Sequence, residues 1–207
     1  LNNEPHKIQW SAKDDIEEIK LSDKSLMPDN QIQQFSQHEL RSLVAYVCAG
    51  GQTPMLATAD NVATFYTGKD LVGWRGDEKL WSVENGEIVG KTEKGLKANN
   101  FLKGPFEVAD FKLTLKVKLS PNAANSGVQI RSSNVAGGEM KGPQCDVGKG
   151  WWGKIYEESG RGLLAKEGGE KFVKENEWND YAVEAVGPNL TIWINGEKVA
   201  DLTDDVM

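Results

Sequence analysis

The chain has 207 residues, a formal net charge of −7, and only two histidines and two cysteines. This length suits one medium domain with an appendage, and it is short for two full domains. The lysines and arginines are scattered among acidic residues, so no basic stripe is available for a phosphate backbone and nucleic acid is excluded as a partner. No apolar run approaches the ~20 residues that a membrane span needs.

The two cysteines, Cys48 and Cys145, stand far apart in the chain, and Cys145 falls on the apolar side of an alternating run. This pattern predicts two buried free thiols in preference to a disulfide. The chain begins at Leu1 without a charged and then apolar leader, so we expect it to be processed or cut from a longer gene product.

The N-terminal part of the chain contains one helix signal. Ser36 and Glu39 form a capping box, apolar residues follow at helical spacing, and Gly50 and Gly51 end the pattern. We therefore expect a helix over about residues 37–49 within a helical segment at 1–50. The small and polar stretch at 51–60 is typical of a linker.

The sequence from Asp14 to Val47, with SLMP at 25–28 followed by the capped helix, resembles the C-terminal end of a c-type cytochrome domain. The resemblance implies a cytochrome portion in a longer polypeptide and a sixth iron ligand at Met27. The haem attachment motif Cys-x-x-Cys-His is absent, so haem is not expected on this chain and no cofactor is predicted. For this chain a core or loop role is the favoured interpretation of Met27.

From residue 61 onward the sequence shows the short alternating runs and turn signals that are typical of β-strands. Asn85-Gly86 and Asn195-Gly196 each lie between apolar runs, as in hairpins with primed turns. Residues 111–119 alternate without a fault, which predicts that Phe111, Leu113, Leu115 and Val117 are buried while Lys112, Lys116 and Lys118 are exposed. Many short strands with turn signals between them predict an all-β sandwich at 61–207, preceded by a short α-helical appendage.

Three short alternating runs between Asn125 and Gly162 send polar side chains to one face. Strand periodicity groups Gln129, Arg131, Gln144, Asp146, Lys154 and Tyr156. Such a face suits a sugar, because these groups meet hydroxyls while Trp151 and Trp152 offer flat surfaces to C–H groups. The alternative is an ordinary solvated face, since half-exposed antiparallel sheets normally alternate in this way.

The order of seven motifs carries a second resemblance: FYTGKDLVGW at 65–74, LWSVENGEIVG at 80–90, FKLTLKVKL at 111–119, NSGVQIR at 125–131, EMKGPQCDVG at 139–148, GKIYEE at 153–158 and EWNDYAVEAVGPNLTIWINGEKV at 177–199. Together they resemble the 3-keto-disaccharide hydrolase domain family over about residues 61–207. The resemblance implies a concanavalin-like jelly roll, a carbohydrate substrate, and a periplasmic or secreted location. Family members continue past the hairpin that ends near Leu202, so a domain truncated at its C-terminus is expected.

The family name implies a sugar oxidised at C3, whose ketone acidifies the C2 hydrogen, so elimination followed by hydration is the expected route. The predicted catalytic residues are Arg131 as enolate stabiliser, Asp146 or Glu139 as base, and Tyr156 or Glu157 as acid. The predicted substrate-binding residues are Gln129, Gln144, Trp151, Trp152, Lys154 and Asn179. An ion pair of Arg131 with Asp146 or Glu139 is the structural alternative.

The sandwich region contains no histidine, so a His-ligated metal is excluded there and no metal ligands are predicted; the need for a divalent ion stays open. Two other function classes share the same polar and aromatic face. A non-catalytic carbohydrate-binding module needs no base of matched pKa, and a structural adhesive domain would fill the face with its own side chains. The acids Glu139, Asp146 and Glu157 around Arg131 favour an enzyme.

Overall fold

The computed structural model describes residues 31–49 and 55–206. The chain divides into two units, Leu1–Gly51 and Gln52–Met207. The predicted role of Met27 lies outside the described residues. Among the helices that are described, none has the length and apolar character required to cross a bilayer.

The described part of the first unit is a short 3-10 turn, η2 (Gln31–Gln34), followed by the helix α1 (Gln37–Ala49). The predicted capping box is confirmed. The backbone N–H of Ser36 donates to Glu39 Oε2 at 2.6 Å, and the backbone N–H of Glu39 donates to Ser36 Oγ at 3.2 Å. Each bond satisfies a donor that the helix itself leaves without a partner.

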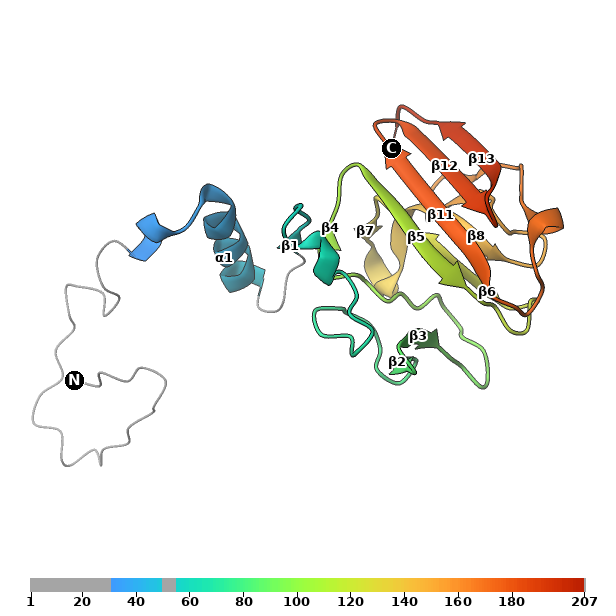
Figure 1. The fold of residues 1–207 in the computed structure, drawn as a ribbon, viewed down its shortest axis with the longest axis horizontal. Helices are drawn as coiled ribbons and strands as arrows, with labels where there is room; N and C mark the ends of the chain where they lie inside the picture. The colour runs from blue at the N-terminus through green and yellow to red at the C-terminus, as the bar shows by residue number, and fades with distance from the viewer. Residues whose placement is uncertain (1–30, 50–54, 207) are drawn as a thin grey trace, which may run out of the picture. The chain divides into compact units, whose positions relative to one another are not determined.

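The second unit is a β-sandwich of two antiparallel sheets (Figure 1). The front sheet contains, in spatial order, β13 (Glu197–Thr203), β12 (Asn189–Ile194), β11 (Asn179–Val186) and β5 (Phe111–Val117). The back sheet contains β10 (Gly162–Ala165), β9 (Ile155–Glu158), β8 (Met140–Gly148) and β6 (Asn125–Gln129), and β7 (Ser133–Asn134) pairs with the start of β8. The predicted all-β sandwich is confirmed.

Smaller elements complete this unit. They are the parallel pair β1 (Met55–Leu56) and β4 (Phe106–Glu107), the hairpin β2 (Trp81–Glu84) and β3 (Glu87–Gly90), and the 3-10 turns η3 (Val62–Thr64), η4 (Ala136–Gly138) and η5 (Glu170–Phe172). Both predicted hairpins are confirmed. In the turn before β13, Asn195 and Gly196 have φ values of 50° and 87°, the left-handed conformation that a primed turn requires.

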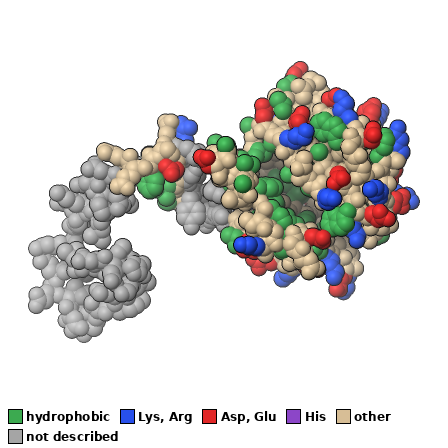
Figure 2. Space-filling view, viewed as in Figure 1, with side chains coloured by type: hydrophobic (Ala, Val, Ile, Leu, Met, Phe, Trp, Pro, Cys, Tyr) green, Lys and Arg blue, Asp and Glu red, His purple; other side chains and the backbone are tan. Residues whose placement is uncertain are grey.

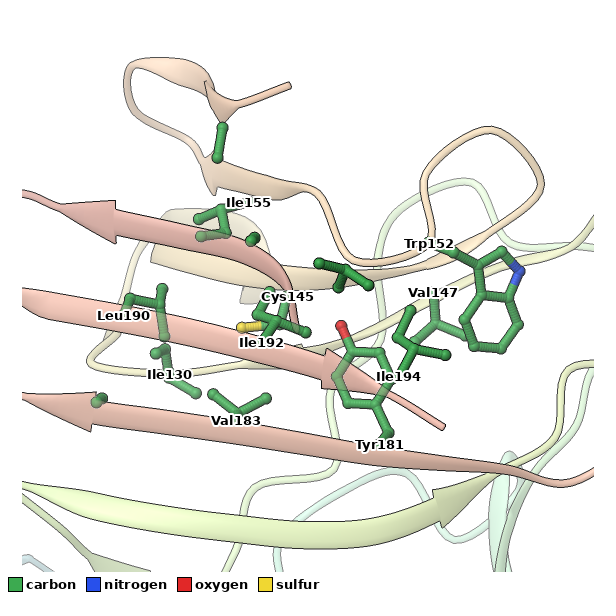
Figure 3. Close-up of a cluster of buried hydrophobic side chains, with 14 residues drawn as sticks. Ile130, Cys145, Val147, Trp152, Ile155, Tyr181, Val183, Leu190, Ile192 and Ile194 are labelled. Atoms are coloured by element: carbon green, nitrogen blue, oxygen red, sulfur yellow. The ribbon is translucent and has the colours of Figure 1, made fainter. Parts of the chain in front are cut away.

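The core lies between the two sheets and draws side chains from both (Figure 3). The back sheet contributes Cys145, Val147 and Ile155, and the front sheet contributes residues such as Val183 and Ile192. Cys145 is a free and fully buried thiol, as predicted, whereas the side chain of Cys48 lies outside the described residues. Apolar area removed from water on these two inner faces is the main term that holds the sheets together.

The strand β5 alternates as predicted, but its inner side chains are less buried than expected. Lys112, Lys116 and Lys118 are exposed, whereas Phe111, Leu113, Leu115 and Val117 are only half-buried. In the described part of the chain β5 pairs with β11 along one edge and ends the front sheet at the other. Alternation identifies the inner face of a strand, but the number of neighbouring strands decides how completely that face is covered.

Candidate functional site

Three polar side chains from three strands form a row across the outer face of the back sheet. Gln129 of β6 pairs in register with Gln144 of β8, which pairs with Tyr156 of β9. A chain neighbour of each of them belongs to or packs against the core: Val128 before Gln129, Cys145 after Gln144 and Ile155 before Tyr156. Since successive side chains in a strand point to opposite faces, the row faces outward. The predicted shared face is confirmed for these three residues.

Asp146 extends this row along β8. It lies two residues beyond Gln144 and opposite Gly127 of β6. A Cβ atom at Gly127 would stand 2.6 Å from Gln144 Cγ, so the glycine leaves the room that the Gln144 side chain occupies. From that position Gln144 Nε2 donates to Asp146 Oδ1 at 2.8 Å.

The backbone of Asp146 is fixed from two sides. Its N–H donates to the carbonyl of Lys154 at 2.9 Å, and its carbonyl accepts from the N–H of Gly153 at 2.9 Å. The hydroxyl of Tyr181, from the front sheet, donates to the same carbonyl at 3.2 Å. A carboxylate that acts on a substrate needs this kind of support, because its position must be held before the substrate arrives.

The Asp146 carboxyl is poised for proton transfer. The residue is only 3% exposed, and its Oδ2 atom is buried without a hydrogen-bond partner. Burial raises its pKa to about 6, the Gln144 hydrogen bond opposes that rise, nearby Glu158 adds to it, and Lys154 opposes it. A carboxyl with this pKa is largely ionised at neutral pH and still basic enough to accept a proton.

Gln129 offers a second acceptor on the same face. Its Nε2 atom donates to Ser132 Oγ and to the carbonyl of Gly142, both at 2.8 Å, while its Oε1 atom is buried without a partner. Buried acceptors without partners are uncommon and destabilising. Gln129 Oε1 and Asp146 Oδ2 are thus two buried acceptors on this sheet for which the described chain supplies no donor.

Two further carboxylates lie toward the other end of the row. Glu158 follows Tyr156 by two residues and pairs with Gly142 of β8. Burial raises the pKa of Glu158, and the nearby charge of Glu139 raises it further. Glu139 accepts hydrogen bonds from the backbone N–H and the side-chain amide of Asn99, each at 3.1 Å. The sequence prediction missed Glu158, although the strand period counted from Tyr156 selects it in place of Glu157.

The aromatic side of the site is formed by Trp151. The residue is 42% exposed, and its ring meets that of Tyr156 edge to face, with centroids 6.0 Å apart. The Nζ atom of Lys154 lies 5.1 Å from the centroid of the Trp151 ring. Trp152 points the other way, is 1% exposed within the core, and donates from Nε1 to Asn122 Oδ1 at 2.8 Å. The predicted role of Trp152 as a sugar platform is therefore wrong, and that of Trp151 stays a prediction.

Arg131 does not lie with Asp146, which corrects the predicted convergence. The strand β6 ends at Gln129, and Arg131 has a φ of 44°, which redirects its side chain. The guanidinium donates to the carbonyls of Gly187 and Ala109 and forms an ion pair with Asp110 at 3.2 Å. Arg131 therefore ties the back sheet to the turns that precede β5 and β12.

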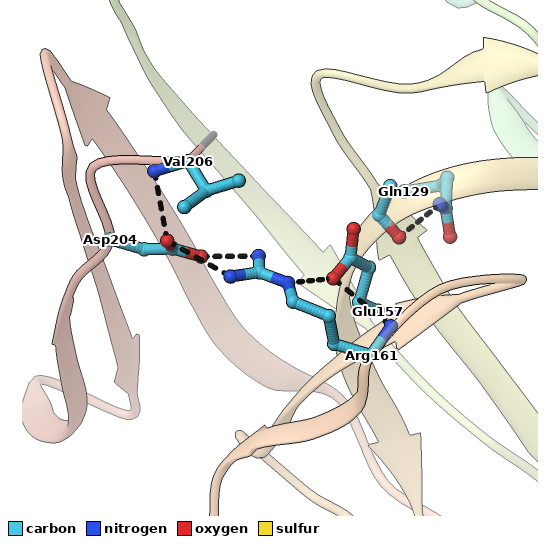
Figure 4. Close-up of polar contacts among 6 residues, drawn as sticks. Gln129, Glu157, Arg161, Asp204 and Val206 are labelled. Carbon is cyan, nitrogen blue, oxygen red and sulfur yellow. Dashed lines mark hydrogen bonds and ion pairs between the residues drawn. The ribbon is translucent and has the colours of Figure 1, made fainter.

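Glu157 also has a structural position. It lies between Tyr156 and Glu158, so it points away from the row, and it pairs with Arg161, which also pairs with Asp204 after β13 (Figure 4). The hydrogen bond from Arg161 is the main reason that the pKa of Glu157 is lowered. This arginine joins the end of the back sheet to the end of the front sheet. Glu157 is therefore corrected from a catalytic acid to a member of this inter-sheet clamp.

Asn179 was predicted to bind substrate, but it is fully buried. Its Oδ1 atom accepts from the N–H of Lys174 and from Asn195 Nδ2, both at 2.8 Å. Its Nδ2 atom donates to the carbonyls of Lys174 and Glu177. These bonds hold the loop that leads into β11 and leave the amide no polar atom for a ligand.

Two hollows in the described chain lie away from this row. One, of about 650 Å³, lies on the outer face of the front sheet, and the other, of about 460 Å³, borders β2 and β3. Among residues 31–49 and 55–206 there is also no group of three or more His, Cys, Asp or Glu side chains placed to hold a metal ion. The row centred on Asp146 thus differs from the hollows by its chemistry, namely buried acceptors and raised pKa values.

Comparison with known proteins agrees with this architecture. The chain is similar to a crystal structure described as a putative glycosyl hydrolase from Parabacteroides distasonis, with 22% identity and a TM-score of 0.51 over 72% of this chain and 77% of that chain. At this identity the likeness shows the fold. No curated protein matches the chain. The sequence model of the 3-keto-alpha-glucoside-1,2-lyase-like domain matches residues 61–207, so the chain belongs to that family.

Proposed function

We propose that the sandwich cleaves 3-keto-glycosides on the outer face of the back sheet, by elimination followed by hydration. Its family is one of carbohydrate-active, hydrolase-like domains. The observation that carries the proposal is Asp146, a carboxyl held in position by backbone bonds, with one buried oxygen free and a pKa near 6. A ketone at C3 of a sugar acidifies the hydrogen at C2, and a positioned carboxylate of this basicity can remove it.

In the first step Asp146 Oδ2 takes the C2 proton, and the electron pair of the C–H bond moves into an enolate on the C3 oxygen. A cation and amide donors stabilise that developing charge. Lys154, whose charge already lowers the pKa of Asp146, would stabilise the enolate in place of Arg131. The side-chain amide of Gln144, on β8, would donate a hydrogen bond to the same oxygen.

In the second step the enolate collapses to form a C1–C2 double bond, and the bond from C1 to the glycosidic oxygen breaks. The hydroxyl of Tyr156 gives its proton to the leaving oxygen. Water then adds its oxygen to C1, C2 recovers a proton from Asp146, and the second proton of the water restores Tyr156. The products are a free 3-keto sugar and the released alcohol, so atoms and protons balance.

The acids beyond Tyr156 suit the part of the substrate that does not react. Glu158 pairs with Gly142, four residues from Asp146 on β8, a separation of about 13 Å along the strand. This exceeds the reach of one sugar ring. Glu158 and Glu139 would therefore accept hydroxyls of the neighbouring unit, while Trp151 packs against C–H groups near the reacting ring.

The direct test incubates the chain with a 3-keto disaccharide and measures the released monosaccharide. We expect release by the wild type, and a loss of about 10²–10⁴-fold in Asp146→Asn, because the amide cannot accept the C2 proton. Asp201→Asn is the matched control, since Asp201 is exposed on the other sheet and pairs with Lys198. The rate should rise with pH through about 6 as Asp146 ionises.

Two results would contradict the proposal. Equal turnover by Asp146→Asn and the wild type would remove Asp146 from the chemistry. Binding of the 3-keto disaccharide without release of monosaccharide would instead support the non-catalytic binding module. A periplasmic or secreted location remains part of the proposal and can be tested by fractionating cells that express the protein.

A further inference from the structure

The outer face of the front sheet carries a hollow of about 650 Å³ beside a tryptophan. Thr114 of β5, Ala182 of β11 and Trp193 of β12 form one row in register across three strands. Ala182 stands in the middle of this row, and its methyl group leaves the space between its larger neighbours unfilled. The hollow therefore follows from a small residue placed beside a large one.

Trp193 is not required by the core. The inner face of β12 is supplied by Leu190, Ile192 and Ile194, all fully buried. Trp193 lies on the opposite face, half-buried, with Lys112 Nζ 5.1 Å from its ring centroid. A solvent-facing position in an antiparallel sheet normally holds a small polar or charged side chain. An indole at such a position is therefore a candidate for contact with a ligand.

The charges around the hollow cancel one another. Lys112 pairs with Glu184 at 3.5 Å, and Lys116 pairs with Asp180 at 3.6 Å. Figure 2, which has the same view as Figure 1, shows positive and negative side chains interspersed over the sandwich. A face without excess charge does not select an anionic or a cationic ligand, whereas hydroxyl groups can bond to ammonium and carboxylate groups alike.

We propose that this hollow is a second glycan-binding surface, on which one unit of a neutral sugar chain stacks on Trp193. Its hydroxyl groups would bond to Thr114, Lys116 and Asp180, which border the same hollow. An aromatic face beside a few convergent polar groups is the usual chemistry of sugar recognition.

This surface differs from the row around Asp146 in position and in chemistry. It lies on the other sheet, with the core between the two. None of the buried polar atoms without a partner in the described chain, which belong to Asn122, Gln129 and Asp146, borders it. The proposal for this surface therefore does not depend on the chemistry proposed for Asp146.

The test titrates the full chain with cellohexaose, maltohexaose and laminarihexaose by calorimetry. We expect at least one of them to bind the wild type, and Trp193→Ala to weaken that binding about tenfold. Ala182→Leu provides a second variant that fills the hollow without removing the indole. Its control is Thr191→Leu, which introduces the same side chain on the same face but outside the hollow and should bind normally.

Turnover of a 3-keto disaccharide by Trp193→Ala should equal that of the wild type, which separates this surface from the proposed active site. Three outcomes would overturn the inference. These are no binding of any of the three hexaoses, binding that is lost in Trp151→Ala but kept in Trp193→Ala, and self-association of the protein that depends on Trp193, which would assign the surface to a second copy of the chain.

Discussion

At the scale of single residues, the candidate site depends on a carboxyl that the fold makes less acidic. Asp146 is buried, accepts one hydrogen bond and leaves one oxygen without a partner. An unpaired buried oxygen lowers the stability of the folded protein, and such a cost is retained most often where function requires it. Replacement of Asp146 should therefore change the stability of the folded protein.

We predict that Asp146→Asn is more stable than the wild type at pH 8. The carboxyl binds protons more tightly when folded, with a pKa of about 6, than when unfolded, so its contribution is most favourable below about pH 4 and declines as the pH rises through 6. Melting temperatures measured from pH 4 to pH 8 should diverge with increasing pH. An unchanged difference across that range would show that burial does not perturb this group.

A second prediction concerns the glycine that faces Asp146. Gly127→Ala should lower the turnover number about 10–100-fold, because the new methyl group displaces Gln144 and with it the hydrogen bond that orients Asp146. Ser126→Ala, on the exposed residue beside it, is the control and should retain wild-type turnover. If Gly127→Ala is fully active, Gln144 does not orient the carboxyl.

At the scale of elements, the local signals in the sequence were reliable where they depend only on neighbouring residues. The capping box, the two Asn-Gly turns and the parity of Gln129, Gln144 and Tyr156 were all predictable from spacing. The two-residue period of a strand no longer predicts side-chain direction beyond the end of the strand. Arg131 lies beyond the end of β6, and no neighbouring residue signals the left-handed conformation that redirects its side chain. The turn that separates Trp151 from Trp152 also decides which indole is exposed, and composition does not specify it.

The strand β5 provides a test at this scale. We predict that Leu115→Asp lowers the free energy of unfolding by about 2–3 kcal/mol, because a half-buried apolar contact is replaced by a charge against the core. The denaturant midpoint should fall accordingly. Lys116→Asp reverses a charge at the adjacent, exposed position, and its effect should be much smaller. Equal effects of the two substitutions would show that β5 contributes little to the sandwich.

At the scale of the whole sandwich, two arginines connect the sheets through polar contacts. Arg131 binds the turns before β5 and β12, and Arg161 joins Glu157 to Asp204. The side chains of Glu157 and Asp204 are 13% and 9% exposed, so removal of Arg161 would leave two nearly buried carboxylates without their cation.

We therefore predict that Arg161→Met lowers the melting temperature at pH 7, and that Arg161→Met combined with Asp204→Asn recovers part of the loss. Arg161 lowers the pKa of both carboxyls, so its contribution is present at neutral pH, begins to decline below their unfolded values near 4, and is lost as the pH falls through their lowered folded values. Lys198→Met is the control, because its partner Asp201 is exposed. A loss of melting temperature that is as large at pH 3 as at pH 7 would contradict the electrostatic explanation.

The free thiol of Cys145 in β8 can report when the two sheets separate. Cys145 stands between Gln144 and Asp146 in the sequence but points into the core, where burial raises its pKa and suppresses its reactivity. An alkylating reagent can reach it only when the sheets part. In a Cys48→Ser background, the rate of alkylation would thus report the opening of β8, the strand that carries Asp146. Substrate that binds to the outer face of this strand should lower that rate.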